Sequence, residues 1–152
     1  MHSTAPFFQF ESDFVESLRC IPMRVRYNLD TCGVKLKLEH WHHFDESERR
    51  ALVELPCFSE SEIAAYRDVV RRLVFDRTRT YPKDLPVDPH PSWMTGKIPV
   101  QVLEKAASEE VAISTQQWAA LSSLQKFALV KLSRPSHENK NFLPALREFG
   151  IV

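Results

Sequence analysis

The sequence contains little glycine and has no net charge. Only three glycines occur among 152 residues, while the ten prolines cluster at the edges of segments. Because sheet-rich folds need many tight turns, this distribution favours helices joined by stiff corners and predicts an all-α protein. Twenty Lys and Arg side chains balance twenty Asp and Glu side chains. The balance gives the chain no general attraction to nucleic acid or to an anionic membrane.

Long apolar runs are also missing. No run approaches the roughly 20 residues of a membrane-spanning helix, and the N-terminus lacks the pattern of a signal peptide. We therefore expect a cytoplasmic protein, and three cysteines at no framework spacing suit a reducing compartment. Apolar residues make up 43% of the chain and charged residues 26%. These values predict a single domain over residues 1–152, a compact bundle of about seven short helices.

Two segments are expected to lie outside the helical body. Residues 80–99 are rich in proline, which disfavours helix, and they predict a connection that Leu85 and Trp93 pin to the body. Residues 1–12 predict an arm that docks through three aromatic side chains, Phe7, Phe8 and Phe10.

Helix signals recur between these segments. Pro22 suits the start of a helix and Gly33 the left-handed residue after its end, so a helix is predicted over about 22–32. Phe58 and Ile63 are spaced as a hydrophobic staple around a further helix start. Ahead of the helix predicted over 22–32, Phe14, Val15, Leu18 and Ile21 recur at i, i+1, i+4 and i+7, which predicts one face of an earlier helix. Capping boxes are predicted for the pairs Asp45 with Glu48 and Ser59 with Glu62.

The chain also resembles itself. An ungapped shift of 77 residues places 22–55 on 99–132 and brings Trp41 onto Trp118. This alignment predicts two three-helix repeats about a pseudo-twofold axis, with the prolines connecting them, and the alternative is packing rules shared by unrelated helices. The expected buried core pairs are Trp41 with Trp118 and Leu52 with Leu129.

The segments after the first helix of each repeat alternate apolar and polar residues. Val34, Leu36 and Leu38 show this pattern in one repeat, and Val111 and Ile113 show it in the other. We expect at most a tiny two-stranded ribbon, formed between these two segments.

Candidate metal or redox chemistry rests on the three cysteines. Cys20, Cys32 and Cys57, with one histidine, have the residue types of a zinc or iron–sulfur site. Their spacing contains no close pair, so buried thiols without a ligand are the favoured interpretation and no cofactor is expected. His40, His42 and His43 flank Trp41, and we interpret them as a solvated polar face rather than a metal site.

Two polar stretches are candidate contact surfaces for a partner. Arg67 and Arg71 belong to a basic stripe on the long amphipathic helix that is predicted to follow the cap at Ser59, although interleaved acids also fit an ordinary solvated face. A second stretch lies before the last helix, where Asn139 and Asn141 also suit helix capping. Its candidate partner-binding residues are Arg134, His137, Asn139, Lys140 and Asn141.

Four strings of the chain are distinctive: FVESLRCIPM from Phe14, LDTCGVKL from Leu29, Pro56-Cys57, and LQKFALVKLSRPSHENKNF from Leu124. Together they resemble the bacterial nitrate reductase-associated protein family. The resemblance implies an accessory role for the assimilatory nitrate reductase, a molybdenum-cofactor and iron–sulfur enzyme. It brings no catalytic or ligand residues to this chain.

No catalytic constellation is recognisable, so a non-enzymatic assembly or maturation factor that binds the reductase is the function we expect. The alternative is a small thiol-based metal or redox carrier that serves the same enzyme. A helix-turn-helix regulator around Trp41 and Ala51 is disfavoured by the zero net charge.

Overall fold

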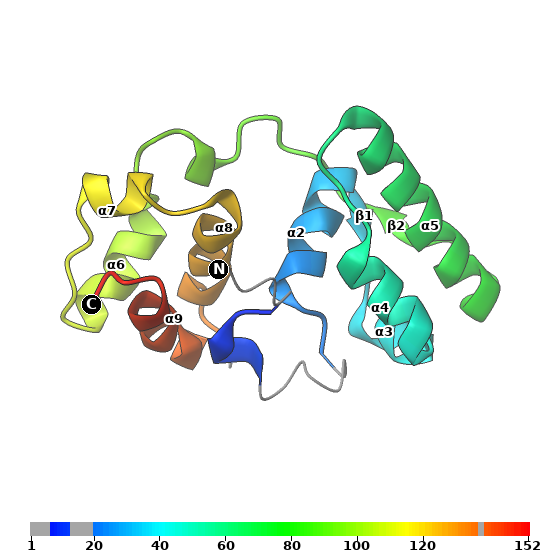
Figure 1. Ribbon diagram of the computed structural model, residues 1–152, viewed down its shortest axis with the longest axis horizontal. Helices are drawn as coiled ribbons and strands as arrows, with labels where there is room; N and C mark the ends of the chain where they lie inside the picture. Colours follow the sequence, from blue (N-terminus) through cyan, green and yellow to red (C-terminus); the bar gives the residue numbers. More distant parts are fainter. Residues whose placement is uncertain (1–6, 13–19, 137–138) are drawn as a thin grey trace, which may run out of the picture. The chain divides into compact units, whose positions relative to one another are not determined.

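The computed structural model describes residues 7–12, 20–136 and 139–152. Within them the chain is all-α, as predicted, with eight α-helices and one two-stranded ribbon (Figure 1). It falls into two compact units, residues 1–87 and 88–152, and their boundary lies inside the expected proline-rich connection. No helix in these ranges is long and apolar enough to cross a membrane. Outside the described residues lie Phe14, Val15 and Leu18 of the predicted apolar face, and His137.

The first unit holds four α-helices in its described residues. Its elements are η1 (Gln9–Glu11), α2 (Met23–Cys32), β1 (Val34–Lys35), α3 (Leu38–His43), α4 (Glu46–Glu54), α5 (Glu60–Thr78) and β2 (Lys83–Asp84). As predicted, α2 follows Pro22 and ends at Gly33, whose φ of 77° is left-handed. The N–H of Gly33 donates to the carbonyl of Leu29 at 2.9 Å. Glycine is required here because a Cβ would lie 2.8 Å from Cγ2 of Val87.

Both predicted capping boxes are present in the first unit. Asp45 accepts from the N–H of Glu48 at the start of α4, and Ser59 accepts from the N–H of Glu62 at the start of α5. The predicted staple is wrong, because Phe58 is 83% exposed and packs little against any neighbour. The reciprocal side-chain bonds fix this helix start without it.

The ribbon is present, but its predicted pairing is wrong. Val34 pairs with Asp84 and Lys35 with Lys83 in an antiparallel register, so β1 does not pair with Val111 and Ile113. The N–H of Val111 instead donates to the carbonyl of Ala106 and closes the end of a helix in the second unit.

The core of the first unit gathers apolar side chains from α2, α3, α4 and α5. Trp41, Leu52, Val25 and Val70 are fully buried. The hydroxyl of Tyr66 is a polar group inside this core, and it donates to the carbonyl of Leu52 at 2.6 Å. The buried donor therefore has its acceptor inside the core.

The second unit has a comparable series of helices, and none in its described residues is as long as α5. Its elements are η2 (Ser92–Met94), α6 (Val100–Ser108), α7 (Thr115–Ala119), α8 (Ser123–Ser133), η3 (Asn139–Asn141) and α9 (Phe142–Glu148). Trp118, Leu129 and Phe142 are fully buried. Trp93 meets the ring of Phe127 edge-on at 6.2 Å, so the connection is pinned to this unit at the predicted tryptophan.

The helices agree with the predicted duplication. The shift of 77 residues carries the first residues of α2, α3 and α4 onto those of α6, α7 and α8. Both expected pairs, Trp41 with Trp118 and Leu52 with Leu129, are fully buried. The repeats therefore share helix starts and core positions, while the pseudo-twofold axis remains a prediction.

Candidate functional site

The cysteines are unbridged, and two of them are deeply buried. Cys32 and Cys57 are each 5% exposed, while Cys20 is half-buried. Burial raises the pKa of Cys32 to about 12, with the neighbouring Cys57 adding to the effect. Burial also raises the pKa of Cys57 to about 11. Both thiols are thus protonated at neutral pH, whereas thiol nucleophiles and metal ligands act as thiolates.

The described residues contain no group of three His, Cys, Asp or Glu side chains placed to hold a metal ion. Cys20, Cys32 and Cys57 all belong to the described residues, so the structure does not bring these three cysteines together as a set of metal ligands. The thiols of Cys32 and Cys57 instead face backbone carbonyls of α2, those of Leu29 at 3.8 Å and Asn28 at 3.9 Å.

The histidines around Trp41 differ from the predicted solvated face in one respect. His42 and His43 are exposed, but His40 is only 9% exposed. Its Nδ1 accepts from the N–H of Lys37 at 3.1 Å, which caps the start of α3. Burial and the charge of Lys37 lower the pKa of His40, so the neutral imidazole is the form that the fold uses.

Arg67, a candidate contact residue, is engaged inside the first unit. Its Nη1 donates to the carbonyls of Cys32 and Gly33 at 3.2 and 3.0 Å. Its Nη2 pairs with Asp84 at 2.6 Å. The guanidinium joins the end of α2 to β2, which is a structural task.

Arg71 lies one turn further along α5. Its guanidinium carbon is 4.6 Å from the centroid of the Tyr81 ring, and that ring stacks on Phe75. The buried Nε of Arg71 has no hydrogen-bond partner in the part of the chain that is described. The aromatic stack holds this cation against α5.

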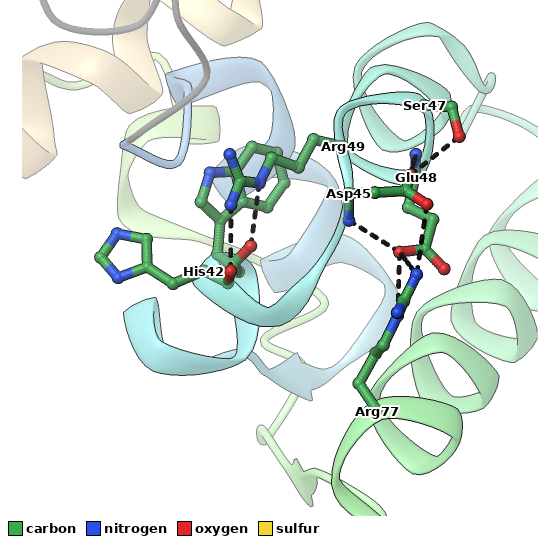
Figure 2. A network of polar contacts seen from close by, with 7 residues as sticks. His42, Asp45, Ser47, Glu48, Arg49 and Arg77 are labelled. Atoms are coloured by element: carbon green, nitrogen blue, oxygen red, sulfur yellow. Dashed lines mark hydrogen bonds and ion pairs between the residues drawn. The ribbon is translucent and has the colours of Figure 1, made fainter.

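Arg77 forms a network that the sequence did not reveal (Figure 2). From the last turn of α5, its Nη2 lies 2.7 Å from Glu48 and 3.2 Å from Asp45. The N–H of Glu48 and the hydroxyl of Ser47, with a smaller contribution from Arg77, lower the pKa of Asp45. The network joins α5 to the capped start of α4.

Each buried tryptophan lies beside a cation at the same position of its repeat. The guanidinium of Arg49 is 6.0 Å from the Trp41 ring, and it donates to the carbonyls of Trp41 and His42 (Figure 2). Lys126 places its ammonium 5.9 Å from the Trp118 ring. Arg49 and Lys126 align in the internal repeat, as Trp41 and Trp118 do. The sequence therefore indicates that each tryptophan has a cation at the same spacing.

The polar stretch after α8 brings its candidate residues into one short segment. Arg134 and Lys140 are exposed, and Asn139 and Asn141 are half-buried. Neither cation forms an ion pair with any described residue. The capping alternative fails for Asn141, which precedes α9 but makes no side-chain cap bond.

We name this the tail segment, residues 133–141. It lies at the end of α8, a helix that contains two lysines and no acid. The repeat-equivalent helix α4 begins at an acidic cap and contains three glutamates. Lys131 of α8 aligns with Glu54 of α4, whereas Lys126 aligns with Arg49, so the two helices differ chiefly in the acids that α8 lacks.

No curated protein and no solved structure gives a significant match to the chain. A family model described as conserved nitrate reductase-associated protein matches residues 7–149. This match spans both units and includes the tail segment. The chain therefore belongs to the conserved nitrate reductase-associated protein family.

Proposed function

We propose that the chain is an accessory protein, not an enzyme, that supports assimilatory nitrate reductase by binding it as an assembly or maturation factor. The family described as nitrate reductase-associated supports this assignment. Two buried thiols with raised pKa values argue against a thiolate carrier. Such a factor would act in the cytoplasm and need no cofactor of its own.

The observation that carries the proposal is the pair of exposed cations in the tail segment, Arg134 and Lys140, which contrast with two arginines of the first unit. In the first unit, Arg67 and Arg77 are held in ion pairs with acids of the same unit. In the tail segment, Arg134 and Lys140 have no acid partner among the residues that the structure describes. Exposed cations without internal partners steer and orient an acidic surface of another protein.

The test is a pull-down of nitrate reductase by the tagged protein and its variants. Arg134→Glu with Lys140→Glu is expected to weaken capture at least tenfold, because two attractive contacts become repulsive. Lys35→Glu makes the same kind of charge reversal at an exposed position of β1 and serves as the control. The thermal melt should be unchanged in both variants, since these side chains are exposed.

Unaltered capture by the double variant would remove the tail segment from the contact surface. Capture lost equally in the Lys35→Glu control would show that net charge, not this segment, matters. Failure of the wild-type protein to capture the reductase, at low salt and with apoenzyme, would contradict the proposed function itself.

A further inference from the structure

Helix α6 has apolar residues on two faces. Val102 and Ala106 are fully buried in the second unit. Val100, Leu103 and Ala107 recur at i, i+3 and i+7 on another face and are exposed, Val100 by 69% and Leu103 by 40%. Single exposed apolar side chains are ordinary, but several of them at helical spacing on one face form a candidate contact surface for another molecule.

The start of the same helix has no side-chain cap among the described residues. Pro99 occupies the N-cap position and provides no side-chain cap bond, and the first turn of α6 contains no acid. The first N–H groups of a helix have no partner within the helix and attract a negatively charged acceptor. We name this start, together with Val100, Leu103 and Ala107, the α6 face.

The other repeat shows what covers the equivalent position. Met23 of α2 aligns with Val100 and is only 3% exposed. Its N–H donates to Oε1 of Glu11 at 3.0 Å, and Glu11, itself 2% exposed, accepts from Phe8 N–H through its other oxygen. The rings of Phe8 and Phe10, from the same turn, stack with their centroids 5.3 Å apart. A short aromatic turn therefore delivers a buried carboxylate to the helix start.

We propose that the α6 face binds a segment of a partner protein with the same chemistry, a short turn with one carboxylate between aromatic side chains. The chain's own segment is already used, because Glu11 is buried against α2. The residue that aligns with Glu11, Asp88, is exposed and accepts from the N–H of His90, so among the described residues the second repeat supplies no such carboxylate to its own helix start. Lys97, exposed just before α6, adds a positive charge that complements the carboxylate.

The full-length protein provides the test, with a synthetic peptide of residues 5–12 as the probe. Titration of isotope-labelled protein is expected to give saturable shifts of the Val100, Leu103 and Ala107 amides. The Glu11→Gln peptide should bind at least tenfold more weakly, because it loses the charge that the helix start attracts.

Matched variants separate the α6 face from the helix in general. Leu103→Gln is expected to lower peptide affinity at least tenfold, whereas Ser108→Gln, which places the same side chain at the exposed end of α6, should leave it unchanged. Melting curves confirm that both variants fold.

Three results would overturn the proposal. They are the absence of saturable binding, shifts centred on Met23 instead of Val100, and equal affinity for the wild-type peptide and its Glu11→Gln variant. Self-association of the full-length chain that Leu103→Gln abolishes would make a second copy the occupant, and it would also overturn binding of a foreign segment. None of these measurements uses the reductase, so they are independent of the proposed function.

Discussion

The two repeats begin their helices at equivalent residues but cap them with different chemistry. In the first repeat the capping side chains are His40, Asp45 and Glu48, which belong to ionisable residue types. In the second repeat the aligned residues are Gln117, Ser122 and Gln125, which are neutral at every pH, and they make the same backbone bonds. The geometry of a cap thus constrains the position of a hydrogen-bonding atom and leaves its charge open.

The charged caps occur where a cation is available to complement them. Arg77 of α5 binds both Asp45 and Glu48, and the second repeat is followed by the short α9 instead of a helix like α5. The first unit therefore pairs Arg77 with its capping acids, while Arg134 and Lys140 of the second unit have no ion pair with a described residue.

Replacing the paired tryptophans should give the largest effect. Trp41→Ala and Trp118→Ala each remove a fully buried ring, and each is expected to lower the free energy of unfolding by about 3–5 kcal/mol. Urea denaturation measures both losses. A loss below about 1 kcal/mol for one of them would show that the two repeats do not depend on their cores equally.

The aligned residues Gly33 and Glu110 distinguish the helix ends. Both have a left-handed backbone, with φ of 77° and 60°. Gly33→Ala is expected to cost about 2 kcal/mol, because its Cβ meets Val87 at 2.8 Å and the carbonyl of Leu85 at 3.0 Å. Glu110→Gly should instead stabilise by up to about 1 kcal/mol, since it relieves left-handed strain. Thermal melts that show equal costs would contradict this difference.

Exchange of His40 and Gln117 should move the pH dependence from one repeat to the other. Because burial holds the pKa of His40 below its ordinary value of 6.5, the unfolded chain takes up a proton more readily than the folded one. The stabilisation is complete above about pH 6.5 and is lost as the pH falls below it. His40→Gln should reduce the change in melting temperature between pH 7.5 and 5.5. Gln117→His should make the melting temperature depend on pH through the second repeat.

Gln117→His is the control for this exchange, because it places a histidine at the aligned cap position of the second repeat. If wild type and His40→Gln lose the same melting temperature on acidification, the proton responsible is bound elsewhere.

Loss of the Arg77 network should give the smallest effect. Arg77→Gln removes two exposed ion pairs, so it should lower the melting temperature slightly at low salt and hardly at all in 0.5 M NaCl. Lys126→Gln, which changes a cation of the second unit outside any such network, should show little salt dependence. A large salt-independent loss for Arg77→Gln would point to packing rather than charge.

Local signals in the sequence predicted much of this fold. Pro22, Gly33 and the capping pairs act within a few residues, and they located the helix ends correctly. The shift that aligns Trp41 with Trp118 also identified equivalent buried positions. Such features depend on neighbours along the chain, which a sequence displays directly.

Features that join distant segments were not predictable. The ribbon partner of Val34 is fixed by the return of the chain after α5, and the partners of Arg77 lie 29 and 32 residues away in sequence. Arg67 was grouped with a solvated stripe because nothing local shows that it reaches Gly33 and Asp84. Long-range polar contacts depend on how helices pack, and periodicity does not specify that.

The reach of Arg67 has a consequence for synthesis on the ribosome. Its guanidinium holds carbonyls at the end of α2 and the carboxylate of Asp84, which is added to the growing chain 51 residues after Gly33. Until Asp84 emerges from the exit tunnel, Arg67 cannot form its ion pair with β2, and the end of α2 is not yet linked to that strand. Completion of the first unit therefore waits for the start of the proline-rich connection, so a nascent chain arrested within α5 should still be open to proteases.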